Sequence, residues 1–136
     1  MIKPIVKDRL FLQQKAQLAT KEDIKIGQDL LDTLNVNQDR CVGMAANMIG
    51  VQKRAIIFMY GMVPVIMFNP ILKKKVSPYQ VEESCLSLVG SCLATRYKEI
   101  TVEYLDRNWQ KQTLILKDFP AQICQHELDH LEGILI

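Results

Sequence analysis

Two histidines one helical turn apart are the residues of this sequence best suited to chemistry. His126 and His130 bound the run H-E-L-D-H, and the chain has no other histidine. Side chains four residues apart share one face of a helix, so both imidazoles can bind one metal ion, with Glu127 beside the open position. A metal ion would lower the pKa of water, and Glu127 could accept the proton and later return it. The alternative is two surface histidines on an amphipathic helix.

A third metal ligand is expected because catalytic sites of this kind commonly use three protein ligands. It must be a carboxylate or one of the four cysteines, which are Cys41, Cys85, Cys92 and Cys124. Cys85 lies in the short stretch V-E-E-S-C-L-S, residues 81–87, which could form a strand edge beside the helix. Spacing alone does not select Cys85 over the other candidates.

Two helices are predicted ahead of the strands. The first covers residues 10–18, with Asp8 as its cap. The second begins near Thr20 or Asp23, because apolar residues then recur at helical spacing, and it ends between residues 35 and 37.

The middle of the chain predicts antiparallel strands. Residues 54–59 and 63–68 form one pair, which Asn69-Pro70 interrupts, and residues 99–104 and 112–116 form another around a turn at 106–108. A last helix opens at Pro120 and stops at Gly133. The predicted fold class is α+β, with antiparallel strands packed around a C-terminal helix that carries H-E-x-x-H, in a single domain of residues 1–136.

Composition narrows the function classes. The chain has 136 residues, 49% of them hydrophobic, and a net charge of +2. The only basic run, residues 73–75, reads as a solvated turn, so direct nucleic-acid binding is not expected. No signal peptide or membrane-spanning stretch is present, so no membrane association is expected. We expect a cytoplasmic protein with reduced thiols.

Three segments resemble, in order, the signature motifs of the peptide deformylase family. Residues 125–133, Q-H-E-L-D-H-L-E-G, match Q-H-E-x-D-H-L-x-G at every fixed position. Residues 83–87, E-S-C-L-S, are similar to E-G-C-L-S, with Ser84 in place of glycine. Residues 43–50, G-M-A-A-N-M-I-G, resemble G-L-A-A-P-Q-I-G. The resemblance covers nearly the whole chain from about Ile5.

The resemblance implies an enzyme that removes the formyl group from the N-terminal formylmethionine of nascent polypeptides. One divalent metal ion per chain would bind Cys85, His126 and His130; it is Fe(II) in the cell in most members, and zinc, nickel or cobalt can occupy the same site. Glu127 would be the general base and then the acid. The backbone N–H of Leu86 would donate to the formyl oxygen as it gains negative charge.

A wider set of residues is expected around the substrate. Glu83 and Arg96 match positions that pair in relatives and would hold the Cys85 segment. Four apolar residues are expected either to receive the methionine side chain or to be plain core: Val42, Val81, Phe119 and Ile123. The expected substrate-binding set is Val42, Gly43, Val81, Glu83, Phe119 and Ile123.

The sequence departs from the family in the first two motifs. Met48 replaces a glutamine whose amide helps to hold the formyl oxygen, and a thioether cannot donate a hydrogen bond. Losing one such donor typically lowers kcat by roughly 10²–10³. Asn47, in place of proline, could supply an amide, although adjacent residues of a strand point to opposite faces. Cys41 and Ser84 replace glycines and could narrow the groove.

Two function classes follow. The first is an active deformylase, slowed by Met48; the second is a catalytically impaired, metal-binding relative that acts as a peptide binder or as a regulator. An ordinary zinc peptidase shares the histidine–glutamate helix but does not explain the cysteine motif. The chain stops three residues after Gly133, so ribosome association would have to occur without the C-terminal extension of some relatives.

Overall fold

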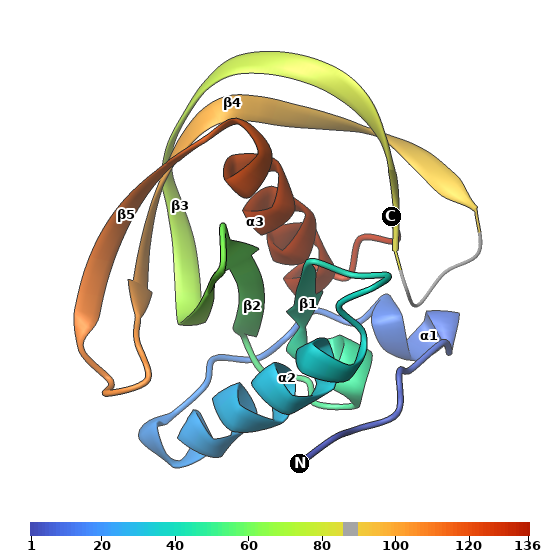
Figure 1. The fold of residues 1–136 in the computed structure, drawn as a ribbon, viewed down its shortest axis with the longest axis vertical. Coiled ribbons are helices and arrows are strands. Elements are labelled where there is room, and N and C mark those ends of the chain that lie inside the picture. Colours follow the sequence, from blue (N-terminus) through green and yellow to red (C-terminus); the bar gives the residue numbers. More distant parts are fainter. Residues whose placement is uncertain (86–89) are drawn as a thin grey trace.

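The structure is a computed structural model that describes residues 1–85 and 90–136. Its helices are α1 (Arg9–Leu12), α2 (Lys25–Val36) and α3 (Asp118–Leu131), with 3-10 turns η1 (Lys21–Ile24) and η2 (Ala46–Ile49), and its strands are β1 (Gly43–Ala45), β2 (Ala55–Tyr60), β3 (Val63–Ser84), β4 (Ser91–Leu105) and β5 (Lys111–Lys117). The described strands form one antiparallel sheet in the order β1-β2-β3-β4-β5. The long strands β3 and β4 arch over α3 (Figure 1). The predicted α+β class is confirmed.

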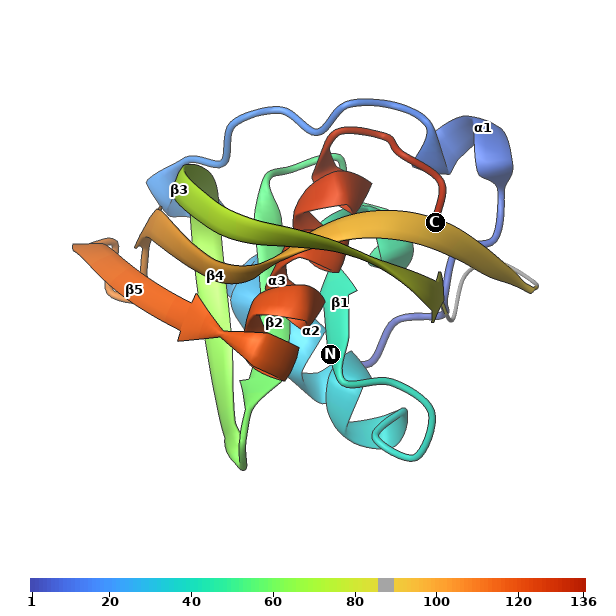
Figure 2. The same ribbon diagram turned by 90° about the horizontal axis from the view of Figure 1, so that it is seen from above.

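The sheet is covered by a helix on each side because its strands alternate between two apolar faces. Ile57 of β2 packs in one core cluster with Leu30 of α2. Its neighbours Ile56 and Phe58 pack in the other cluster with Ile123 of α3. Figure 2 shows α3 lying against the sheet beneath β3 and β4. The site-bearing helix is therefore fixed by a continuous buried face.

The first predicted helix is wrong in length, and the second is confirmed. Asp8 does cap α1, but the helix ends at Leu12, because the backbone of Gln17 bonds instead to Gln52 and Arg54. These tertiary bonds override the local preference for helix. Thr20 and Asp23, where the helix was expected to begin, form a capping box of the η1 turn that leads into α2.

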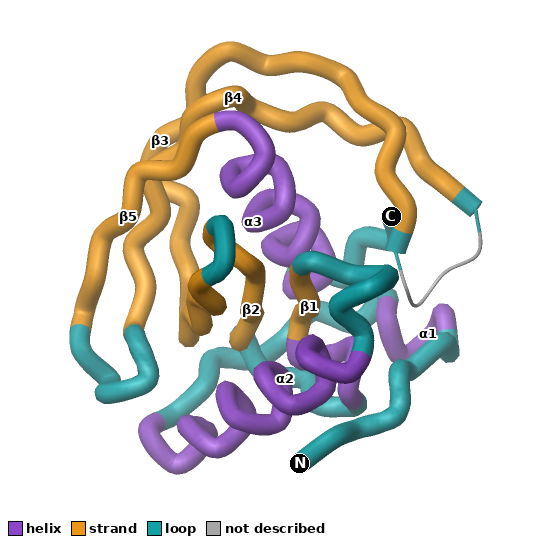
Figure 3. Tube along the Cα trace, viewed as in Figure 1, coloured by secondary structure: helices purple, strands orange, loops and turns teal. Residues whose placement is uncertain are grey.

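Two predicted breaks in the strands are wrong. Asn69-Pro70 leaves β3 continuous and marks a register shift between Phe68 and Ile71, as expected of a proline in a bulge. Residues 73–75 form part of the same strand rather than a turn, with Lys73 close to Glu103 of β4. Figure 3 shows β3 running unbroken along the arch.

The last helix begins two residues earlier than predicted, at Asp118, so Pro120 lies inside its first turn. Gly133 ends it as expected, with φ of +75°. A Cβ there would lie 2.2 Å from the carbonyl oxygen of Gln13, so space as well as backbone conformation requires glycine. None of the helices in the described residues is long and apolar enough to span a membrane.

Candidate metal centre and substrate cavity

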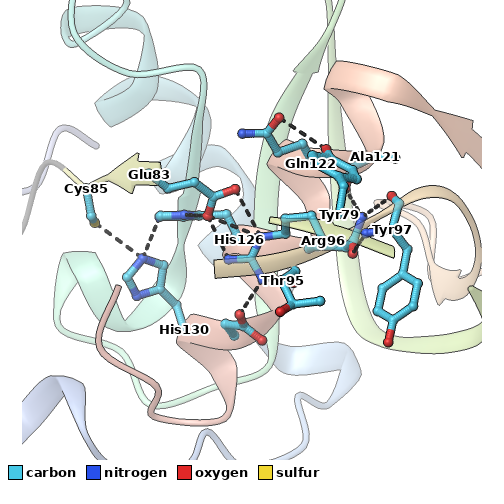
Figure 4. Close-up of polar contacts among 12 residues, drawn as sticks. Tyr79, Glu83, Cys85, Thr95, Arg96, Tyr97, Ala121, Gln122, His126 and His130 are labelled. Atoms are coloured by element: carbon cyan, nitrogen blue, oxygen red, sulfur yellow. Dashed lines mark hydrogen bonds and ion pairs between the residues drawn. The ribbon is translucent and has the colours of Figure 1, made fainter. Parts of the chain in front are cut away.

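The side chains of Cys85, His126 and His130 converge from two elements (Figure 4). Both histidines come from α3, and Cys85 follows the end of β3. The Nε2 atom of His130 lies 3.3 Å from Cys85 Sγ and 3.1 Å from His126 Nε2, and one donor atom from each residue lies within 4.8 Å of the others. Both imidazoles are buried, so the alternative of two surface histidines is wrong.

Glu83 orients His126. Its Oε1 lies 2.8 Å from Nδ1, which leaves Nε2 facing Cys85 and His130. Carboxylate partners of this kind fix the tautomer and orientation of a metal-binding imidazole. Burial raises the pKa of Glu83, but hydrogen bonds from His126 and Arg96 outweigh it and lower the value to about 2. Glu83 is therefore an ionised support for His126.

Arg96 ties this support to the helix. Its Nε and Nη2 atoms donate to both oxygens of Glu83, with the shortest bond 2.7 Å, and Nη1 donates to Asp129 at 2.6 Å. The guanidinium is only 3% exposed. The predicted pairing of Glu83 with Arg96 is confirmed, and Arg96 also joins β3 to α3 through Asp129.

Two amide side chains fix α3 against its surroundings. Gln125 exchanges two 2.8 Å hydrogen bonds with the backbone of Tyr97 on β4. Asn47 donates from Nδ2 to the carbonyl oxygen of His130 at 2.9 Å. The amide of Asn47 therefore holds the end of the helix through one of its N–H groups.

Glu127 is buried beside the cluster with an unused acceptor. Its Oε1 atom has no hydrogen-bond partner among the described residues. Burial raises the pKa of this carboxyl to about 7, a value suited to accepting and returning a proton near neutrality. A Cβ on Gly43 would lie 2.9 Å from Glu127 Oε2 and 2.7 Å from Ile123. Gly43 is thus required for Glu127 to occupy its position.

A cavity of about 420 Å³ opens onto the cluster, and most of the residues predicted to contact substrate line it. Val42, Gly43, Glu83, Phe119 and Ile123 are all in its wall. Val81 is not; it is a half-buried residue of β3 that pairs with Ala94. Sequence analysis missed several polar lining residues: Gln38, Asp39, Arg40, Glu82 and Gln122.

One of the missed residues carried a signal in the sequence. Gln122 precedes His126 by four residues, so helical spacing alone places it on the face of the two histidines. Residues 38–40 belong to the segment between α2 and β1, which had no periodicity to place it. Helical spacing could therefore have found Gln122 but not the loop.

Sulfur atoms occupy the cavity wall opposite α3. Met48 lines the cavity, and its Sδ accepts from the backbone N–H of Ala45 at 3.5 Å. Cys41 and Ser84 also line it, and the Cys41 thiol donates to the carbonyl oxygen of Gly43 at 2.6 Å. Met48 itself therefore contributes no hydrogen-bond donor to the cavity wall. Leu86, whose N–H was expected to face the formyl oxygen, lies outside the described residues.

The donor set fits a divalent metal ion. One thiolate and two imidazole nitrogens suit iron, zinc, nickel or cobalt, and three protein ligands leave a position for a reacting group. The unpartnered Oε1 of Glu127 is a second sign of a missing neighbour in this buried site. Cys92 is exposed and Cys124 is packed in the α3 core, so neither competes with Cys85.

Comparison with known sequences identifies the family of this chain. The family model described as polypeptide deformylase matches residues 2–136. A peptide deformylase of Clostridium beijerinckii is 56% identical over 136 residues, which is 100% of both chains. A peptide deformylase of Nitrosococcus oceani is 37% identical over 131 residues, covering 91% of this chain and 77% of that relative.

Solved structures of peptide deformylases resemble this structure over almost its whole length. The peptide deformylase of Thermotoga maritima has a TM-score of 0.88 at 27% identity, covering 99% of this chain and 95% of that one. A class I type b peptide deformylase of Acinetobacter baumannii, bound to Met-Ala-Ser, has a TM-score of 0.89 at 26% identity, covering 99% and 97%. The resemblance seen in the three motifs is confirmed, and the chain belongs to the polypeptide deformylase family.

Proposed function

We propose that this deformylase is a metal-dependent hydrolase that removes the formyl group from the N-terminal formylmethionine of nascent polypeptides. The observation that carries the proposal is the cluster of half-buried Cys85 with buried His126 and His130, beside Glu127 with its unpartnered Oε1, at a cavity of about 420 Å³. A full-length match at 56% identity to a peptide deformylase supports the same activity.

The three clustered side chains would hold one divalent ion, Fe(II) in the cell, with zinc, nickel or cobalt able to replace it. Such an ion supplies Lewis-acid activation of water and of the formyl carbonyl. Glu127 takes a proton from the attacking water through its free Oε1. The water oxygen adds to the formyl carbon, the carbon–nitrogen bond breaks, and Glu127 returns the proton to the leaving amine. The products are formate and a peptide whose N-terminal methionine carries a free amine.

The cavity wall supplies the seat for the substrate. Val42, Phe119 and Ile123 offer apolar surface for the methionine side chain, and Phe119 is 58% exposed and so free to be covered by a peptide. The backbone N–H of Leu86, a residue outside the described part of the chain, would donate to the formyl oxygen in this proposal. A cytoplasmic location suits a substrate made at the ribosome, and direct contact with nucleic acid is not part of the role.

Turnover of a formylated peptide tests the proposal. Iron-loaded protein, prepared without oxygen, should release formate from formyl-Met-Ala-Ser and leave acetyl-Met-Ala-Ser unchanged. Metal content measured on the same sample ensures that each chain holds one ion. A fully loaded protein that releases no formate would contradict the proposed activity and favour a peptide-binding role.

A further inference from the structure

Gln122 is a polar side chain placed where the substrate methionine is expected. Phe119, Gln122 and Ile123 lie at spacings of three and four on one face of α3, and His126 follows one turn later on that face. All four residues line the cavity. Phe119 and Ile123 are apolar, so the amide of Gln122 is a polar group between two apolar residues of the helix face.

Tyr79 of β3 fixes which way this amide points. Its hydroxyl donates to Gln122 Oε1 at 3.3 Å. Burial raises the pKa of Tyr79, which keeps the phenol protonated as a donor. The amide nitrogen Nε2 therefore lies on the side of the amide away from Tyr79 (Figure 4). No residue in the described part of the chain accepts a hydrogen bond from it.

The position of Gln122 matches the reach of a methionine side chain. Four residues of helix separate it from His126, a rise of about 6 Å. With the formyl group at the metal cluster, as the proposed function requires, a methionine side chain lying along this face of α3 would bring its sulfur, three bonds beyond Cα, toward Gln122. On the proposed function, we infer that Gln122 Nε2 donates a hydrogen bond to that sulfur. Gln122, held by Tyr79, is then a specificity-determining residue that selects a thioether over a hydrocarbon of equal length.

The physical basis is the cost of covering an unpaired donor. A substrate side chain that fills the seat displaces water from Nε2, and a buried N–H without an acceptor is unfavourable. Norleucine, which has a methylene in place of sulfur, offers no acceptor. A thioether is a weak acceptor and a sulfoxide oxygen a strong one. After the difference in side-chain size is taken into account, kcat/KM should therefore be lowest for norleucine, higher for methionine and highest for methionine sulfoxide.

The test compares three peptides of the form formyl-X-Ala-Ser, where X is methionine, norleucine or methionine sulfoxide. The values of kcat/KM are measured for the wild type, Gln122→Leu and Tyr79→Phe. Gln80→Leu is the matched control, because Gln80 is an exposed glutamine next to Tyr79 that does not line the cavity. Binding of the unformylated products is measured in parallel by calorimetry, which does not depend on turnover.

Gln122→Leu should lower the methionine-to-norleucine ratio by about twofold to threefold and the sulfoxide-to-norleucine ratio by about tenfold, the range for weak and good neutral hydrogen bonds. Tyr79→Phe should move both ratios the same way by less, and Gln80→Leu should leave them unchanged. The product dissociation constants should follow the same order.

Unchanged ratios in both variants would overturn the inference, since a merely structural Tyr79–Gln122 contact would lower all three substrates equally. The calorimetric ratios decide the matter even for a protein that turns over nothing. Absence of turnover on every formyl peptide would instead count against the proposed function alone.

Discussion

The two walls of the cavity differ in how their polar groups are held. The ligand wall is the metal-ligand cluster of Cys85, His126 and His130 together with its supports Glu83 and Arg96; of these, Glu83, Cys85 and His126 line the cavity itself. Its charges are paired through short bonds, among them 2.8 Å from Glu83 to His126 and 2.7 Å from Arg96 to Glu83. Such charge-assisted bonds are about twice as strong as neutral ones.

The substrate wall, formed by Cys41, Val42, Gly43 and Met48, carries sulfur where the family has glycine and glutamine. Its side-chain contacts are a thiol donating to the carbonyl oxygen of Gly43 and a thioether accepting from Ala45. Sulfur is a weak donor and acceptor. We therefore expect metal binding and stabilisation of the formyl oxygen to be separable, because the ligand wall is joined by several paired charges and the substrate wall by single contacts. Changes in the ligand wall should cost far more than changes in the substrate wall.

The largest effect is expected from Cys85→Ala. Two imidazoles alone would remain of the three-residue cluster, so the protein should lose stoichiometric metal and all formate release. Metal analysis after dialysis, together with the turnover assay, measures both. Cys92→Ala is the control, because Cys92 is exposed and away from the cluster. Full metal occupancy in Cys85→Ala would move the third ligand elsewhere.

Glu127→Ala should separate metal binding from proton transfer. Among the described residues, Glu127 Oε1 has no hydrogen-bond partner, so metal content and folding should persist. Loss of general acid–base catalysis should lower kcat by about 10²–10⁴-fold. The exposed cavity carboxylate of Glu82 provides the comparison, and Glu82→Ala should keep most activity. Unchanged kcat in Glu127→Ala would remove this residue from the mechanism.

Arg96→Met tests the cooperativity of the ligand wall. Removing the cation leaves Glu83 buried without its main partner, which should lower the free energy of unfolding by about 3–5 kcal/mol. Loosening the support of His126 should also weaken metal affinity by about 10–100-fold. Urea denaturation and competition with a chelator measure the two effects.

Lys111→Met is the control for Arg96→Met, because its ion pair with Glu103 is largely exposed. Pairs of that kind contribute about 0–1 kcal/mol. Equal, small losses in the two variants would show that the network around Arg96 is not cooperative and would remove the contrast between the walls.

The same contrast explains what the sequence could predict. The ligand wall was predictable because helical spacing brings His126 and His130 together, and the motif around Cys85 completes the set. The ends of local elements were harder to predict. Helix α1 stops early because Gln17 bonds to a distant segment, and β3 continues past Asn69-Pro70 because β4 pairs with it at Phe68 and again from Ile71 onward. Long-range pairing of this kind has no local signal in the sequence.

The substrate wall was harder to predict for the same reason. Its residues come from a segment without periodicity, and their neighbours are set by tertiary packing. The resemblance identified Gly43, but the requirement for glycine there became clear only from its close approach to Ile123 and Glu127. Val81 was expected either to receive the methionine side chain or to be plain core, and the structure leaves it out of the cavity wall.

The smallest effect, and the one that defines the substrate wall, is expected from Met48→Gln. Glutamine has nearly the length of methionine and adds an amide donor toward the developing oxyanion. That bond strengthens as charge develops in the transition state, so the gain should appear mainly in kcat, by about tenfold. Met48 is only 1% exposed, so burying an amide should also lower the free energy of unfolding by about 1–3 kcal/mol if the amide is unpaired without substrate.

Met48→Leu is the matched control for the added donor, because leucine fills the same apolar site and donates nothing; its kcat should not rise. Steady-state kinetics on formyl-Met-Ala-Ser, measured well below the unfolding temperature of each variant, separate the gain in rate from the loss in stability. A wild-type rate already as high as that of Met48→Gln would show that Leu86 and the metal suffice for the formyl oxygen. In that case the thioether of Met48 would not lower kcat, and catalysis would not depend on a hydrogen-bond donor at position 48.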